Sequence, residues 1–286
     1  MSNVPPLAPF DLSKGIASRV TLADGHRMPV LGLGVWRTPP GNATQTAVGH
    51  ALRIGYRSID TAAMYGNEAD VGEAIRTSGI PRDELFVTTK VWNDDQGFQE
   101  TLAAFDRSQR ALDVGVVDLY LVHWPVSGKR LETWKALLHL QRDGRCRSIG
   151  VSNFTVRHLE ELREQTGVLP AVNQVEFNPF LYQRELLEYC RGHRIQLEAW
   201  APLVRAQRMS DPVIQQVARA HHATPAQILV RWGLQHEVVE IPKSVHSERI
   251  AENAGVFEFR LSPQQMAALD GLNVNLRTAW DPSEMA

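Results

Sequence analysis

Short apolar segments alternate with longer amphipathic segments along almost the whole of this chain. The short segments are rich in β-branched residues, which is typical of strands buried on both faces. The longer segments have the apolar spacing of surface helices. Alternation of this kind predicts a parallel sheet whose strands are joined by helices. Eight such units predict a closed (β/α)8 TIM barrel rather than an open sheet.

The expected elements can be placed by residue number. We expect the eight strands near residues 31–35, 57–59, 85–89, 117–122, 148–151, 171–175, 196–200 and 238–241. We expect helices near residues 44–53, 68–77, 98–112, 131–143, 156–165, 184–192, 212–222, 225–234 and 247–254.

The two ends of the chain carry additions to this pattern. Residues 19–22 and 27–30 flank Asp24-Gly25, which predicts a β-hairpin before the first barrel strand. Residues 1–18 are expected to be a flexible segment, and a final helix near 263–269 precedes a tail to Ala286. Because no linker or composition break divides the chain, we expect residues 1–286 to form one domain, as barrels of about 250 residues do.

Composition and charge disfavour several classes of function. The 286 residues are 43% hydrophobic and 22% charged, with a formal net charge of −2, which argues against nucleic acid or an anionic membrane as the main partner. No segment approaches the ~18 apolar residues of a membrane span, and residues 1–15 lack the pattern of a signal peptide. Cys146 and Cys190 have no pairing or metal-ligand spacing, which fits a reducing compartment. We expect a cytoplasmic monomer without nucleic-acid or membrane partners.

Three common functional motifs are incomplete in this chain. In Gly32-Leu33-Gly34-Val35-Trp36-Arg37, an arginine stands where a dinucleotide fingerprint has its third glycine. In Gly150-Val151-Ser152-Asn153-Phe154, a phenylalanine replaces the last glycine of a hydrolase nucleophile elbow. The ten histidines include no His-Glu-x-x-His pair, so no metal site is expected.

The stretch from Arg57 to Glu68 is the first candidate for chemistry. It reads as a strand, a turn, and a helix that Asn67 would cap. Asp60 at the strand end and Tyr65 in the turn would lie at the end of the barrel where such enzymes place their active sites. Alternatively, Asp60 only ties down the loop and Tyr65 packs beneath it.

Two further polar residues end neighbouring strands. The third strand delivers Lys90 and the fourth delivers His123. Lys90 alone could be half of an interior ion pair, and His123 alone could be an ordinary core histidine. Because the carboxyl ends of all barrel strands meet at one mouth, four such residues together indicate a site.

Several motifs are placed separately along the chain. They are Gly32-Leu33-Gly34-Val35-Trp36, Asp60-Thr61-Ala62, Tyr65-Gly66-Asn67-Glu68, Thr89-Lys90-Val91-Trp92, Asp118-Leu119-Tyr120-Leu121-Val122-His123-Trp124-Pro125, Gly150-Val151-Ser152-Asn153-Phe154 and Ile241-Pro242-Lys243-Ser244-Val245. With these motifs, about residues 20–273 of the chain resemble the aldo-keto reductase superfamily. Within it, the short loops and Trp200-Ala201-Pro202-Leu203 are most similar to the prokaryotic 2,5-diketo-D-gluconate reductase group.

The resemblance implies NADP(H)-dependent interconversion of carbonyls and alcohols, with Asp60, Tyr65, Lys90 and His123 as the catalytic residues. Tyr65 would donate the proton, although the reference pKa of tyrosine is about 10. Lys90 at ~4 Å would favour the phenolate by up to about 4 kcal/mol and so lower the pKa of Tyr65. Asp60 would keep Lys90 charged, and His123 would orient the carbonyl oxygen.

The resemblance also implies a set of cofactor contacts. Ser152, Asn153 and Gln174 fit the positions that bind the nicotinamide carboxamide, and Trp200 the position that stacks on the ring. For Gln174, a hydrogen bond inside the barrel is nearly as good an explanation. Lys243, Ser244 and Arg249 fit the 2′-phosphate pocket. The remaining cofactor positions are Leu203, Val245, Glu252 and Asn253.

One loop departs from the family pattern. Relatives carry glycine after Pro202-Leu203, whereas this chain reads Val204-Arg205-Ala206-Gln207-Arg208, which has no easy access to positive φ. Our hypothesis is that Arg205 or Arg208 contacts the cofactor pyrophosphate instead. The alternative is a solvated basic loop.

The expected substrate is a small-molecule carbonyl, such as an aldehyde or keto-sugar. Trp36, Trp92, Trp124 and Trp280 could line an aromatic pocket for it, although tryptophan is also common in cores. Two other functions are compatible with the fold. They are an NADPH-binding regulatory subunit with little turnover, and a barrel hydrolase that uses His123 and Asp60.

Overall fold

The computed structural model describes residues 6–285, and residues 1–5 of the expected flexible segment lie outside it. The strands are β1 (Arg19–Thr21), β2 (Arg27–Pro29), β3 (Leu33–Gly34), β4 (Ser58–Asp60), β5 (Phe86–Val91), β6 (Val117–Val122), β7 (Cys146–Ser152), β8 (Val172–Glu176), β9 (Gln196–Trp200) and β10 (Val239–Glu240). The α-helices are α1 (Asn42–Arg53), α2 (Glu68–Thr77), α3 (Phe98–Leu112), α4 (Arg130–Arg142), α5 (Val156–Thr166), α6 (Arg184–Gly192), α7 (Pro212–His221), α8 (Pro225–Gln235), α9 (Ser247–Ala254) and α10 (Pro263–Asp270).

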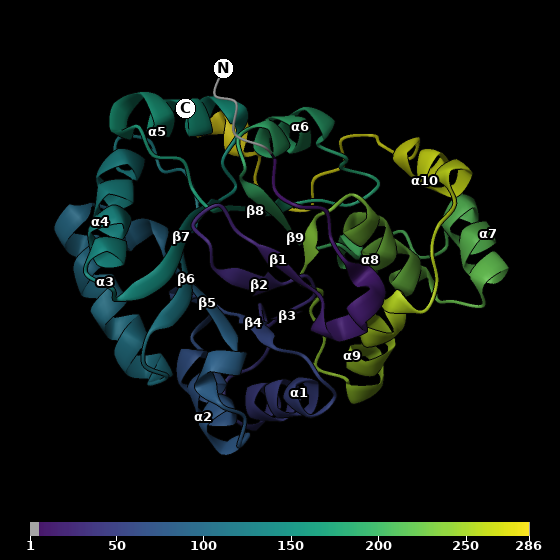
Figure 1. Cartoon of the computed structure of the whole chain (residues 1–286), viewed down its shortest axis with the longest axis horizontal. Helices are drawn as coiled ribbons and strands as arrows, with labels where there is room; N and C mark the ends of the chain where they lie inside the picture. Colours follow the sequence, from purple (N-terminus) through teal and green to yellow (C-terminus); the bar gives the residue numbers. More distant parts are fainter. Residues whose placement is uncertain (1–5, 286) are drawn as a thin grey trace.

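The eight strands β3 to β10 form one parallel sheet in sequence order. Parallel bridges from Leu31 to Glu240 and from Gly34 to Lys243 join its first and last strands, and the Gly32 amide donates to the Glu240 carbonyl at 2.8 Å. The sheet is therefore closed, and Figure 1 shows the helices arranged around the ring of strands. The predicted (β/α)8 barrel is confirmed.

The strands are buried on both faces, as their composition predicts. Every residue of β5 and β6 is buried. The interior faces carry the polar residues described below, while the outer faces pack against helices, for example Tyr120 against Phe105 of α3 at 4.8 Å between ring centroids. Within residues 6–285, no helix has the length and apolar character needed to cross a membrane.

The segment before β3 covers the end of the barrel where the strands begin. The predicted hairpin is present as the antiparallel pair β1–β2, with Val20 and Met28 buried beneath it. Residues Leu12–Ala17 form a 3-10 helix, η1, so part of the segment expected to be flexible has regular structure. Its partly buried Leu12 and Ile16 pack against the core, which explains its order.

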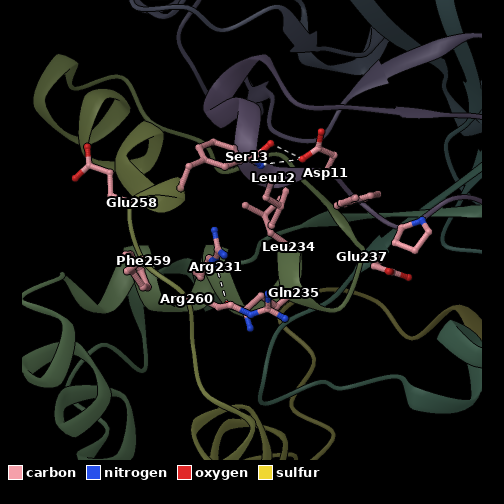
Figure 2. A pocket seen from close by; sticks show the side chains of 13 residues that line it. Asp11, Leu12, Ser13, Arg231, Leu234, Gln235, Glu237, Glu258, Phe259 and Arg260 are labelled. Atoms are coloured by element: carbon pink, nitrogen blue, oxygen red, sulfur yellow. Dashed lines mark hydrogen bonds between the residues drawn. The ribbon is translucent and has the colours of Figure 1, made fainter.

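A cavity of about 670 Å³ remains between residues 9–13, α8 and the 3-10 helix η6 (Gly255–Phe257). Figure 2 shows its polar side chains, several of which bond to one another. Asp11 accepts from the Ser13 hydroxyl at 2.6 Å, and Arg231 donates through Nε to Gln235 at 2.9 Å. We attribute this cavity to the packing of the N-terminal segment against the barrel.

The start of α2 differs from the sequence expectation. Asn67 occupies the N-cap position but makes no side-chain capping bond. Its side chain instead accepts from the Thr61 hydroxyl at 2.7 Å and donates to the Val35 carbonyl at 3.1 Å. Because the side chain is fully buried, its polar atoms are bonded to neighbouring loops, and so Asn67 ties the loop after β3 to the loop after β4.

Gly72 offers a test of helix packing around the barrel. A Cβ atom at Gly72 of α2 would lie 1.8 Å from the Leu112 carbonyl oxygen at the end of α3. Gly72→Val should therefore lower the free energy of unfolding by about 3 kcal/mol, measured by urea denaturation. Gly49→Ala is the matched control, because a Cβ there would meet only Arg53 Nη1 at 3.5 Å. It should stabilise α1 by about 0.5–1 kcal/mol, and equal effects of the two variants would contradict the packing.

Candidate active site

The strands place four polar side chains at one end of the barrel. Asp60 is the last residue of β4, Lys90 lies near the end of β5, and His123 directly follows β6. Tyr65 ends the short 3-10 helix η2 (Ala63–Tyr65) after β4. Asp60, Tyr65 and His123 line a cavity of about 780 Å³, and Lys90 lies fully buried behind it.

Lys90 connects these residues. Its ammonium nitrogen lies 2.6 Å from Asp60 Oδ1, 2.9 Å from the Thr61 carbonyl oxygen and 3.5 Å from the Tyr65 hydroxyl. Burial alone would lower the pKa of Lys90, but the charge of Asp60 and the Tyr65 phenol outweigh it, and the pKa is raised. Lys90 is therefore a protonated cation facing the Tyr65 oxygen.

The expected lowering of the Tyr65 pKa is wrong for this structure. Burial is the largest influence and raises the pKa of Tyr65 to about 12, although Lys90 opposes it. The expectation counted the attraction of Lys90 and omitted the cost of removing a phenolate from water. Asp60 also offsets part of the Lys90 charge. Tyr65 is consequently protonated at neutral pH.

His123 is held as a neutral imidazole. Burial and, to a smaller extent, the Lys90 charge lower its pKa well below the ordinary value. The ring meets Trp92 edge to face at 5.1 Å between centroids and Tyr65 at 5.7 Å. Its Nδ1 atom is buried without a hydrogen-bond partner among the described residues. The tautomer with hydrogen on Nε2 avoids a buried unsatisfied donor.

The residues expected at the nicotinamide form one hydrogen-bonded group at the ends of β7, β8 and β9. The Asn153 amide donates to the His123 carbonyl at 2.9 Å and to the Ser152 hydroxyl at 3.0 Å. Its oxygen accepts from Trp200 Nε1 at 2.9 Å. Ser152 in turn donates to the Gln174 carbonyl at 2.8 Å. All four residues line the cavity.

Gln174 makes hydrogen bonds inside the barrel, the alternative to a nicotinamide contact that its sequence position allowed. Its side-chain nitrogen lies 2.8 Å from Asp60 Oδ2 and 2.7 Å from Glu198 Oε2. Sequence reasoning missed Glu198, which is fully buried in β9. A signal was present, because Glu198 stands two residues before Trp200 and so shares its face of the strand.

The four expected tryptophans line the cavity, in two places. Trp280, whose residue surface is 58% exposed, approaches Trp124 at 5.3 Å and Trp92 at 6.5 Å between centroids. Trp36 instead lies under two arginines, with the Arg37 and Arg205 guanidinium carbons 4.4 and 4.8 Å from its ring centroid. The cavity therefore has an aromatic part and a cationic part. Lining residues that the sequence analysis did not identify include Arg37, Met64, Arg277 and Thr278.

The glycine-poor loop adopts positive φ without glycine. Val204, Arg205 and Ala206 have φ values of 49°, 49° and 63°, a conformation that costs free energy for such residues. Leu203 and Arg205 line the cavity. Arg208 instead lies over Phe180, 5.5 Å from its ring centroid. Of the two arginines considered for the pyrophosphate, only Arg205 borders the cavity in the described structure.

The region after β10 supplies the remaining cofactor candidates. Lys243 lines the cavity, and partial burial lowers its pKa. Ser244 accepts from the His246 amide at 3.1 Å, and Glu252 accepts from the Thr224 hydroxyl at 2.6 Å. The α9 residue Arg249 is exposed. Val245 and the buried Asn253 lie in the same region, outside the lining of the cavity.

Metal coordination has no support in the part of the chain that the structure describes. No group of three or more His, Cys, Asp or Glu residues there is arranged to hold an ion. The arrangement offers instead a protonated phenol, a buried cation and a neutral imidazole at one cavity.

Comparison with known proteins places this geometry in a family. A model described as "Aldo/keto reductase family" matches residues 30–274. Glyoxal reductase of Bacillus subtilis is 50% identical over 266 residues, covering 93% of this chain and 96% of that protein. Methylglyoxal reductase DkgA of Escherichia coli is 43% identical, covering 93% and 97%.

A crystal structure of a Gox0644 mutant in complex with NADPH superposes with a TM-score of 0.87 at 43% identity, covering 98% of both chains. The sequence match and the shared fold agree over nearly the whole chain. This protein belongs to the aldo/keto reductase family.

Proposed function

We propose that this protein reduces small aldehydes and ketones to alcohols with NADPH, and that Tyr65 is the proton donor. The observation that carries the proposal is the contact of Tyr65 with the Asp60-paired ammonium of Lys90, beside a neutral His123 on one cavity. The named activities of the glyoxal and methylglyoxal reductases support carbonyl reduction. NADPH in the Gox0644 complex supports the choice of cofactor.

The residues present fit NADP(H). The nitrogen of the nicotinamide carboxamide can donate to the acceptor oxygens of Ser152, Asn153 and Gln174. For the phosphates, Arg205 and Lys243 line the cavity, and α9 begins without a side-chain cap hydrogen bond, at a helix end that favours anions. The cofactor supplies the hydride when it is bound.

The proton comes from this chain. Reduction of a carbonyl leaves negative charge on its oxygen, which a positioned acid must neutralise. Tyr65 enters the step protonated, because burial holds its pKa at about 12. Lys90, 3.5 Å from the phenol oxygen, stabilises the phenolate that remains. Asp60 keeps Lys90 charged and in place.

His123 orients the substrate. As a neutral ring with hydrogen on Nε2 it can donate to the carbonyl oxygen without adding a second charge beside Lys90. Trp92, Trp124 and Trp280 provide apolar walls and few hydrogen-bonding groups, which suits a range of small carbonyl compounds. The proposed substrates are therefore small aldehydes, ketones and keto-sugars.

The direct test is oxidation of NADPH with a panel of aldehydes, ketones and keto-sugars. We expect turnover with several members of the panel. Tight NADPH binding without turnover would favour a cofactor-binding regulatory protein, and neither binding nor turnover would reject the proposal.

Tyr65→Phe removes the proton donor and little else. We expect kcat for carbonyl reduction to fall about 10²-fold or more, while the NADPH dissociation constant stays within about twofold of wild type. Steady-state kinetics and fluorescence titration measure the two quantities. Unchanged turnover in this variant would exclude Tyr65 as the acid.

Lys90→Met leaves Asp60 as a buried carboxylate without its cation. We expect a large loss of kcat and a decrease of about 3–5 kcal/mol in the free energy of unfolding, measured by urea denaturation. The matched control is the double variant Lys90→Met/Asp60→Asn, which removes the unpaired charge. It should recover part of the stability and none of the activity, whereas equal stability of the single variant and wild type would contradict the ion pair.

Arg249→Ala tests the choice between NADPH and NADH. A charge-assisted contact to the 2′-phosphate contributes about 1.5–3 kcal/mol, so its loss should weaken NADPH binding roughly tenfold or more and leave NADH binding almost unchanged. Arg260→Ala, an exposed arginine beside the cavity of Figure 2, is the control. Equal affinities of the wild-type protein for the two cofactors would reject the phosphate pocket without affecting the role of Tyr65.

A further inference from the structure

Glu198 is a buried carboxyl inside the barrel that the proposed reaction does not use. It lies in β9 with no exposed surface. One of its oxygens accepts from the Gln174 side-chain nitrogen at 2.7 Å, and the same nitrogen donates to Asp60 at 2.8 Å. Glu198 is thus connected through Gln174 to the Asp60–Lys90 pair and the Tyr65 phenol.

The two carboxyls fix the orientation of the Gln174 amide. An amide nitrogen has two hydrogens, and here one is directed to Asp60 and the other to Glu198. The Gln174 carbonyl oxygen is therefore the atom left for the cavity that this residue lines. Without Glu198, rotation of the amide by about half a turn would lose only one bond, and Asp60 would lose a fixed partner.

We propose that Glu198 is a positioning residue of the reductase site, which holds Gln174 toward the cofactor and, through its own charge state, controls how readily Tyr65 releases its proton. This inference rests on the proposed function. Nothing in the chemistry of proton donation requires a carboxyl at this position, so its removal should alter the reaction without abolishing it.

The charges around Glu198 support the second part of the proposal. The charges of Asp60 in β4 and Lys90 in β5 act on Glu198. The charge of Glu198 acts in turn on Tyr65 of η2, and Glu240 lies in the next strand. Burial, with the charge of Asp60, raises the pKa of Glu198 to about 8, while the Gln174 bond and Lys90 oppose the shift. Glu198 is therefore protonated at neutral pH and ionises in mildly alkaline solution.

Ionised Glu198 adds negative charge near Tyr65 and raises the pKa of the phenol further. A weaker acid transfers its proton more slowly. The rate of reduction should therefore decline as pH rises through about 8. Glu198→Gln keeps the shape of the side chain and can still accept from Gln174, but it cannot ionise.

The first test is the pH profile of kcat for Glu198→Gln and wild type with NADPH and a small aldehyde. From about pH 7 to about pH 9, kcat should fall in both proteins, and the factor by which it falls should be roughly three times larger for wild type than for Glu198→Gln. Glu240→Gln is the control. A Cβ atom built at Gly233 of α8 would lie 1.6 Å from the Glu240 carboxyl oxygen, so this carboxyl faces the helix and not Gln174. It should keep the wild-type profile. Identical profiles for Glu198→Gln and wild type, or the same change in both variants, would overturn the proposal.

The second test separates hydrogen bonding from charge. Glu198→Leu removes the acceptor for Gln174, so the NADPH dissociation constant should rise roughly fivefold, while Glu198→Gln should bind NADPH like wild type. Thermal unfolding shows whether Glu198→Leu is folded. If it is not, the pH profile of Glu198→Gln decides the proposal. Unchanged NADPH binding in folded Glu198→Leu would contradict the positioning of Gln174.

An infrared measurement makes this inference separable from the proposed function. The carboxylic-acid C=O band of Glu198 should be present at neutral pH in wild type, decline through about pH 8 and be missing from Glu198→Gln. If wild type oxidises no NADPH, the proposed function fails while this band still reports the state of Glu198. If wild type is active but the band does not depend on Glu198, this inference fails alone.

Discussion

The ammonium group of Lys90 is a charge with no contact to solvent. The hydrogen bonds at the active-site end of the barrel depend on this buried charge. Removing an unpaired cation from water would cost several kcal/mol, so its donors must be satisfied within the fold. Asp60 and the Thr61 carbonyl do this from the neighbouring strand and loop. Asp60 then needs its own second partner, and Gln174 provides it from 114 positions further along the chain. Such a contact requires the sheet to close, because β4 and β8 belong to opposite parts of the sheet order.

The same burial that makes this network necessary also sets its acid chemistry. A dry environment favours neutral forms, which keeps the Tyr65 phenol protonated and His123 uncharged. Lys90 opposes this preference for neutral forms at the Tyr65 oxygen, which would become negative when the proton is transferred. The site therefore combines a phenol that is protonated at neutral pH with a cation that stabilises the phenolate after the proton is transferred. This combination depends on distances between three separate strands and a loop, and not on any residue alone.

The loop after β9 shows a different kind of constraint. Val204, Arg205 and Ala206 are held at positive φ, where valine in particular is strained. The unfavourable conformation brings Arg205 over Trp36 at the cavity, while the buried Val204 side chain anchors the loop to the core. Because it lacks glycine, the sequence of this loop predicts no easy access to positive φ. The structure retains positive φ and accepts the strain.

The alternation of apolar and amphipathic segments was sufficient to predict the barrel, because it reflects burial that repeats along each strand and helix. Segment 117–122 and segment 196–200 have the predicted bounds as β6 and β9, as do 68–77 and 98–112 as α2 and α3. The sequence also determined which residues end the strands, and hence that Asp60, Lys90 and His123 would share one mouth. Local patterns carry this information, since strand direction fixes where each end lies.

Other properties depended on contacts between distant parts of the chain. The rise of the Tyr65 pKa, the bonding of Gln174 to two carboxyls, the turn of Arg208 away from the cavity and the use of Asn67 as a tie between loops were decided by the tertiary structure alone. Each depends on burial and on the exact partners available. Desolvation and hydrogen bonding of a group depend on all of its neighbours at once. These neighbours come from distant parts of the chain, so the linear sequence does not identify them, and only the folded structure brings them together.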